Sequence, residues 1–170
     1  MRFSRLILLI LVGIFMSVRV GGEGNEYNIK AMFVLNFIKY VQWPFENNSS
    51  IIRIGVVGKS EMTDALRGMT MNRNESKQIV IDEINDESKQ VYKIIFVSKT
   101  ENSKMEEILR RFKGRSVLVI SEDYKGKFSP AINLLNINNK IRFEINLSQA
   151  HDQGIKISSK LNELALTVKP

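Results

Sequence analysis

The sequence predicts a layered α/β fold with a largely parallel sheet flanked by helices. Residues 92–97 and 116–120 are apolar and rich in β-branched side chains, as in strands buried on both faces of a sheet. Segments with helical spacing alternate with the strands, an order typical of parallel strands joined by crossovers. After residue 130 the pattern changes and predicts a C-terminal β-hairpin and a closing helix.

The first 22 residues resemble a secretory signal peptide. Arg2 and Arg5 precede an apolar run at residues 6–16, which is shorter than the roughly 20 residues that span a bilayer. Val20-Gly21-Gly22 supplies a small-residue exit, but Arg19 leaves open both the exact cleavage position and a retained anchor. We therefore expect a periplasmic protein with a signal peptide at 1–22 and a single domain at 23–170.

The composition excludes several classes of function. Residues 23–170 hold 22 basic and 18 acidic residues, a net charge of +4 that is spread along the chain. Nucleic-acid binding is unsupported, because it needs basic residues gathered on one face. The chain has no cysteine, so it forms no disulfide, performs no thiol chemistry and carries no lipid on an N-terminal cysteine.

The first element is a helix at residues 26–41. Its polar residues form only a narrow stripe, so we expect it to be buried on more than one side. Trp43-Pro44 should end it, because the residue before a proline is pushed out of helical geometry. This helix has more apolar residues than one core-facing side requires, which suggests a surface that binds a partner or a second copy of the chain. A homodimer therefore remains open.

Residues 51–57 form a strand that ends in Gly58-Lys59-Ser60, the last three residues of a P-loop motif. The motif also needs a glycine five positions before Gly58, where this chain has Arg53. We therefore interpret Gly58 as a turn and Ser60 as the cap of a helix at 61–69, with no nucleotide site.

The remaining elements follow in order. We expect a short strand at 78–81, a helix at 104–112, and a hairpin of residues 131–135 and 140–145 around an Asn-rich bend. Residues 147–168 have helical spacing, and Gly154 should divide them into a short helical turn and a longer final helix.

No catalytic constellation is visible. His151 is the one histidine, and a metal site or a nucleophilic triad would need further ligands or a base. We interpret the acidic pairs as solvated caps at the ends of elements: Glu61/Asp64, Asp82/Glu83 and Glu122/Asp123. The prediction is a protein that is not an enzyme and has no catalytic residue, no metal site and no cofactor.

Arg142, Glu144 and Asn146 alternate with Phe143 and Ile145 in the second hairpin strand. If the apolar pair faces the core, the three polar residues face outward, and we predict that they contribute to a partner-binding surface. Asn146 has an alternative role as the cap of the next helix. Trp43 and Phe143 are better explained as core aromatics than as partner contacts.

Four motifs occur in one order over residues 26–166: an aromatic helix ending in WP, an I-x-V-x-G strand, an R-F-x-I-N strand and an S-S-x-L-x-x-L-A helix. The matching residues are Phe37, Tyr40, Trp43 and Pro44; Ile54, Val56 and Gly58; Arg142, Phe143, Ile145 and Asn146; Ser158, Ser159, Leu161, Leu164 and Ala165. Together these motifs resemble the YfiR family of small exported bacterial domains.

The resemblance implies a periplasmic regulator that acts by binding. It would restrain the periplasmic part of an inner-membrane signalling protein, a diguanylate cyclase or a sensor kinase, and an outer-membrane lipoprotein would relieve that restraint. Cyclic-di-GMP output and biofilm behaviour would follow. Two other functions remain open: a periplasmic sensor that binds a small ligand, and an envelope assembly factor.

The chain departs from the family pattern at two places. Tyr92 stands where many relatives have a cysteine, which removes any redox control through a disulfide. Phe128-Ser129-Pro130 stands where many have a Gly-Gly turn before the hairpin, so the partner can differ from theirs.

Overall fold

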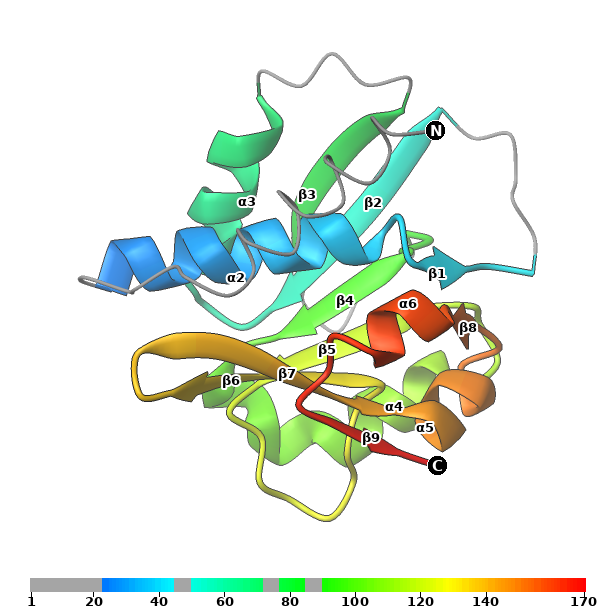
Figure 1. Cartoon of the computed structure of the whole chain (residues 1–170). Coiled ribbons are helices and arrows are strands. Elements are labelled where there is room, and N and C mark those ends of the chain that lie inside the picture. Colours follow the sequence, from blue (N-terminus) through cyan, green and yellow to red (C-terminus); the bar gives the residue numbers. More distant parts are fainter. Residues whose placement is uncertain (1–22, 45–49, 72–76, 85–89) are drawn as a thin grey trace, which may run out of the picture.

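The computed structural model describes residues 23–44, 50–71, 77–84 and 90–170, so the expected signal peptide at 1–22 lies outside the described residues. Its centre is a seven-stranded sheet of strand order β3-β2-β4-β5-β6-β7-β9 (Figure 1). The strands are β2 (Ile51–Val57), β3 (Gln78–Ile84), β4 (Ile94–Val97), β5 (Leu118–Glu122), β6 (Ile132–Ile137), β7 (Lys140–Asn146) and β9 (Thr167–Lys169).

The sheet is parallel from β3 to β6, and β7 is antiparallel to β6. The short edge strand β9 runs parallel to β7. The predicted α/β sandwich with its hairpin is thus confirmed. At the hairpin turn both Asn138 and Asn139 have positive φ, at 50° and 59°. This is the geometry of the tight turns that match the twist of paired strands, and asparagine tolerates it well.

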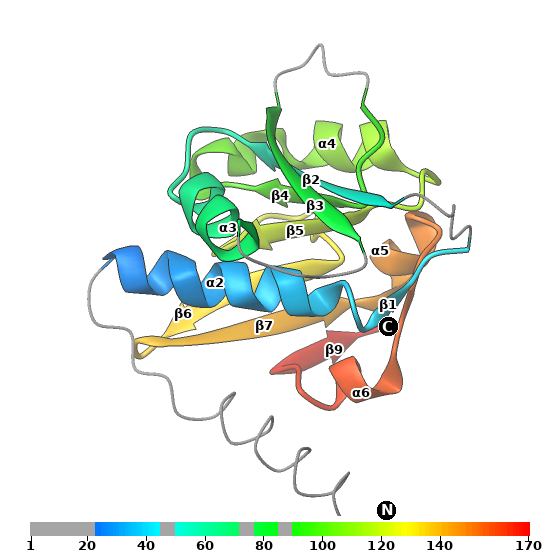
Figure 2. The ribbon, with the colours of Figure 1, turned by 90° about the horizontal axis from the view of Figure 1, so that it is seen from above.

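Helices cover both faces of the sheet (Figure 2). On one face, α2 (Glu23–Phe37) and α3 (Met62–Thr70) pack over the larger core, which includes Leu118 and Ile120. On the other, η1 (Lys99–Lys104) and α4 (Met105–Phe112) cover a smaller core that includes Val119. Every residue of β4 and β5 is buried, as expected for strands enclosed by helices on both sides.

The first helix ends earlier than predicted. It stops at Phe37, where the Tyr40 amide donates to the Phe37 carbonyl in a turn, and Val41–Gln42 forms the strand β1. β1 pairs antiparallel with β8 (Lys156–Ile157), so Trp43-Pro44 follows a strand and does not end the helix. Pairing with a distant strand has overridden the local helical pattern. The helix itself is buried on several sides, as predicted, with Ile29, Phe33 and Phe37 all in the core.

The predicted longer final helix is wrong. The short helix α5 (Leu147–Asp152) ends before Gly154, which has φ +74° as expected for a break. Beyond β8, α6 (Ser159–Asn162) has only four residues, and the chain returns to the sheet as β9. The Leu166 amide donates to the Phe143 carbonyl at 2.8 Å and begins this pairing. The open edge of β7 offers backbone groups that a helix could not satisfy. No helix among the described residues has the length and apolar character to cross a bilayer.

Candidate functional site

The carboxyl ends of the parallel strands form one edge of the sheet. The chain passes from β2 outward to β3 and then returns to the other side of β2 as β4, so the strand order reverses between β2 and β4. Ligands of open α/β sheets commonly bind at such a point. Here Gly58 has φ +86°, and a Cβ on it would collide with the side chains of Ser98 and Glu101. The turn is therefore packed closely against the segment after β4, where a P-loop would surround a phosphate.

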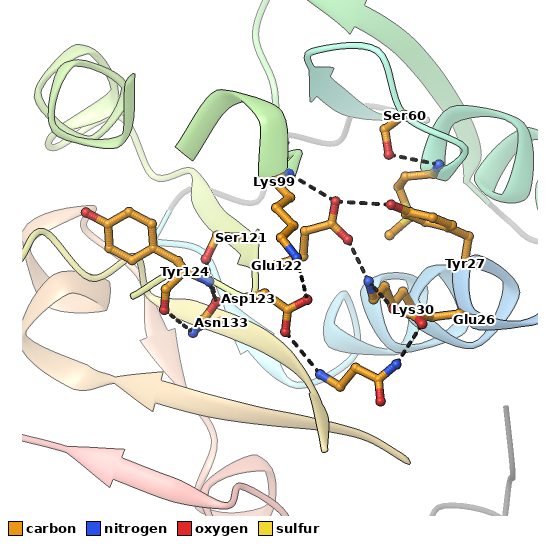
Figure 3. Close-up of polar contacts among 12 residues, drawn as sticks. Glu26, Tyr27, Lys30, Ser60, Lys99, Ser121, Glu122, Asp123, Tyr124 and Asn133 are labelled. Carbon is orange, nitrogen blue, oxygen red and sulfur yellow. Dashed lines mark hydrogen bonds and ion pairs between the residues drawn. The ribbon is translucent and has the colours of Figure 1, made fainter. Parts of the chain in front are cut away.

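A buried ion-pair network lies at the same edge, where α2 crosses the end of β5 (Figure 3). The Lys30 ammonium lies 2.6 Å from one carboxylate oxygen of Glu122, and both side chains are only 2% exposed. The same ammonium lies 2.6 Å from Glu26, one helical turn earlier in α2. Burying charges is costly unless they are paired, and these three groups compensate one another.

The interpretation of Glu122 as a solvated cap is therefore wrong. Its second carboxylate oxygen accepts hydrogen bonds from the Lys99 amide at 3.0 Å and from the Tyr27 hydroxyl at 3.4 Å. Its backbone carbonyl accepts from the Asn102 side chain at 3.1 Å. Lys30 stands between apolar positions of the first helix, a placement that could have indicated a buried partner from the sequence. The identity of that partner, 92 residues away, depends on the tertiary fold.

The network shifts two pKa values upward. Burial raises the pKa of the Tyr27 phenol, and the nearby charge of Glu122 raises it further, while Lys30 partly opposes this. For Lys30 burial alone would lower the pKa, but the hydrogen bond and charge of Glu122, followed by those of Glu26, outweigh it and raise the pKa. Both groups therefore hold their protons more firmly in the folded protein.

A second polar cluster lies on the other face of the sheet beside the end of β5. The Asn133 amide oxygen accepts from the Ser121 hydroxyl at 2.8 Å and from the Tyr124 amide at 3.0 Å, and its NH₂ group donates to the Tyr124 carbonyl at 3.0 Å (Figure 3). The Tyr124 hydroxyl in turn accepts from the Phe128 amide at 3.2 Å. These bonds hold the start of the loop between β5 and β6.

In both clusters the polar groups already form hydrogen bonds or ion pairs with other residues of the protein. Glu122 bonds to three donors and Lys30 to two carboxylates, so neither is poised to accept or deliver a proton to a substrate. Among the described residues no group of three or more His, Asp or Glu side chains could hold a metal ion. The arrangement acts as a clamp that joins α2 to the carboxyl edge of the sheet.

Arg142 and Glu144 lie on the face of β7 that points away from α2. Both are partly exposed, while their neighbours Ile141, Phe143 and Ile145 are buried beneath α2. The core under α4 includes no residue of β6, β7 or β9, so this part of the sheet face lies beyond that core. Glu144 lies 4.0 Å from Lys169 of β9, and its neighbour across the ladder in β6 is Asn133. We call the face formed by Leu135, Arg142, Glu144 and Lys169 the outer sheet face.

Asn146 has the alternative role that its position suggested. Its side-chain oxygen accepts from the Gln149 amide at 3.0 Å and from the Ser148 hydroxyl at 2.9 Å, and so caps α5. His151, in the last turn of α5, is exposed.

Comparison with known families now identifies the domain. Residues 27–166, which are most of the chain, match the YfiR/HmsC-like family. The chain belongs to the YfiR/HmsC-like family. No curated protein matches the sequence.

The motif residues of this YfiR/HmsC-like domain have mainly structural positions. Phe143 is 2% exposed and makes edge-on contacts with Phe33 and Phe37, at centroid distances of 5.8 and 5.2 Å. Trp43 packs at the margin of the same core beneath the Lys93 ammonium, and Pro44 is exposed. Phe37 and Phe143 therefore join α2 to β7.

The two departures from the family pattern also have defined places. Tyr92 is buried in the core beneath α4, where it is 3% exposed. Phe128 follows the Tyr124 loop and is 38% exposed, so this departure alters the surface next to the outer sheet face.

Proposed function

We propose that this YfiR/HmsC-like domain is a periplasmic, non-catalytic regulator that binds and restrains a membrane signalling protein, of the diguanylate cyclase or sensor kinase type. Family membership is the observation that carries the proposal, because the family is generally regulatory and suggests control of cyclic-di-GMP. The saturated polar clusters agree with a role in binding, since their groups serve the fold.

The outer sheet face is the surface that we assign to the signalling protein. Arg142 and Glu144 present charges of opposite sign on a strand whose other face is fixed in the core. Charged groups at the rim of an interface affect partner choice and association rate more than they affect folding. Asn146 contributes indirectly. Its side chain caps α5 and so fixes the point at which α5 begins after β7.

The test is capture of membrane proteins from an envelope extract. Glu144→Lys reverses a partly exposed charge, and we expect it to weaken capture of the signalling protein at least tenfold, as like charges across an interface can cost several kcal/mol. Glu83→Lys is the matched control, because Glu83 is exposed on β3 at the opposite end of the sheet. Both variants should retain the parent melting temperature within the range of surface substitutions. If both variants capture the partner as well as the parent does, the outer sheet face is not the interface.

A sensor of a small ligand is the second candidate, and one cavity favours it. About 760 Å³ of space lies at the carboxyl ends of β2 and β3, lined by residues that include Gly58, Ser60, Thr63 and Glu83. This is the edge where parallel sheets commonly bind ligands. Thermal melts across a panel of small metabolites test this candidate. A compound that raises the melting temperature of the parent but not that of Ser60→Ala would support it, and no shift with any compound would remove it.

A further inference from the structure

Basic side chains that are scattered in the sequence lie together at the amino-terminal ends of the strands. Lys93 precedes β4, and its carbonyl accepts from the Leu118 amide of β5. The Ser116 amide donates to the Gln153 carbonyl at 2.8 Å, which brings the end of α4 next to α5. Gln42 of β1 pairs with Lys156 of β8, and Figure 1 shows β1, β8 and α5 on one side of the molecule.

We call this surface the basic edge. Its members are Lys39, Lys93, Lys113, Arg115, Lys156 and Lys160. All are exposed except Lys93, which is partly exposed. Within this group, Lys113 has an acidic neighbour, Asp152, at 3.7 Å. Among the described residues of these segments, Asp152 and Glu163 are the exposed acids, so cations outnumber anions among them.

The opposite edge of the sheet carries charges of both signs. Glu61 and Asp64 are exposed at the start of α3, and Glu83 lies at the end of β3. Glu101 and Asp123 follow β4 and β5, but the exposed Lys99, Lys125 and Lys127 follow the same strands, and Lys59 follows β2. Among the described residues, acids offset the lysines more fully at this edge than at the basic edge, so a negative surface would favour the basic edge.

Two aromatic rings lie within the basic edge, each beneath a lysine. The Lys93 ammonium lies 5.4 Å from the ring centroid of Trp43, and the Lys160 ammonium 6.0 Å from that of Tyr40. Both rings are partly exposed. Tryptophan and tyrosine are enriched where protein meets the headgroup region of a bilayer, and lysine stems extend along apolar surface while their charges stay in water.

We infer that the basic edge docks on the surface of an anionic phospholipid bilayer. The charges are spread over several segments across a broad surface, which suits an array of headgroups, and the two aromatic rings suit the interfacial layer. This contact would hold the domain at the membrane, with the carboxyl ends of the parallel strands directed away from it. It is a lipid contact separate from the protein contact proposed for the outer sheet face.

Trp43 is the single tryptophan of the chain and lies in the basic edge, so it reports on docking directly. The experiment uses protein purified from cells that express residues 1–170, mixed with phosphatidylcholine vesicles with or without phosphatidylglycerol. We expect sedimentation with the phosphatidylglycerol vesicles, a blue shift of tryptophan emission, and quenching by brominated lipids. Binding should weaken as salt is added, because the attraction is electrostatic.

Two charge-reversal variants locate the contact. Lys156→Glu with Lys160→Glu changes the basic edge and should weaken vesicle binding at least tenfold, because each basic residue near an anionic surface contributes roughly fivefold. Lys59→Glu with Lys99→Glu is the control, since it makes the same change of net charge with exposed lysines at the opposite edge of the sheet. The control should bind as the parent does.

Three results would overturn the inference: no binding of the parent to phosphatidylglycerol vesicles at low salt, equal losses in both variants, or no loss in either. Equal losses would mean attraction by net charge without a defined surface. A parent that ignores vesicles but retains an acidic protein through the same lysines would assign the basic edge to a protein partner. The vesicles hold no signalling protein, so failure here leaves the proposed regulatory function unaffected.

Discussion

At the scale of single residues, Lys30 and Glu122 are the charged side chains that are buried in the described part of the domain. Each is 2% exposed, and their charged atoms lie 2.6 Å apart. Replacing a buried pair by apolar groups can be neutral, but removing one partner leaves an uncompensated charge in a medium of low dielectric constant. The pair therefore makes the position of α2 depend on the exact end of β5.

Lys30→Met should lower the free energy of unfolding by about 3 kcal/mol or more, because Glu122 and Glu26 lose their shared cation. For a domain of this size the melting temperature should fall by roughly 6–12 °C. Adding Glu122→Gln to that variant should restore part of the loss. The control Lys39→Met changes an exposed lysine just beyond the end of α2 and should have little effect. Equal melting temperatures for Lys30→Met and Lys39→Met would show that the clamp is energetically unimportant.

The same network predicts a loss of stability in alkali. The pKa values of Tyr27 and Lys30 are both raised in the folded state, so both groups bind protons more firmly there than in the unfolded chain. Their contribution is complete below about pH 10, the ordinary range of these groups, and is lost as the pH rises through the raised values. Melts in steps from pH 7 to alkaline pH should show this decline, and it should be shallower in a Tyr27→Phe, Lys30→Met double variant. A decline of equal steepness in both proteins would argue against the network as its cause.

At the scale of elements, local signals predicted some segments and tertiary pairing decided others. The strand at 51–57 and the Gly58 turn were predicted correctly, because a β-branched run followed by a glycine specifies its own geometry. The predicted end of the first helix and the predicted length of the closing helix were wrong. In both cases, apolar residues with helical spacing belong to short strands instead. Each of these strands pairs with a strand that is distant in the sequence, which the local spacing does not show.

The predictions for the candidate site residues were also correct where a local pattern decided the outcome and wrong where tertiary contacts did. The alternation from Arg142 to Asn146 correctly indicated which side chains face the core. Glu122 was misplaced because no local pattern shows that α2 passes over the end of β5.

Two glycines with different surroundings give an element-scale prediction. Gly58→Ala should destabilise the domain by about 2 kcal/mol, since the residue has φ +86° and its new methyl group would meet Ser98 and Glu101. Gly68→Ala, within α3 and with nothing near its Cβ position, should stabilise by about 0.5–1 kcal/mol. Chemical denaturation measures both changes. Effects of the same sign would contradict the turn geometry assigned to Gly58.

At the scale of the whole molecule, the fold arranges three surfaces in different directions. The outer sheet face lies at the end of the sheet formed by β7 and β9. The basic edge and the edge formed by the carboxyl ends of the parallel strands lie at opposite ends of those strands. A domain that holds a membrane signalling protein needs a partner surface and an orientation relative to the bilayer, and these surfaces can supply both. In the proposed function, the partner surface and the orientation act together to restrain cyclic-di-GMP signalling.

The most direct measurement of that restraint is the intracellular cyclic-di-GMP concentration in the native host. Deleting the gene should raise it, because the signalling protein is released, and expression of the parent chain should restore it. The Glu144→Lys variant, expressed to the same level, should fail to restore it, whereas the Glu83→Lys control should succeed. An unchanged cyclic-di-GMP concentration after deletion and after overexpression would contradict the account.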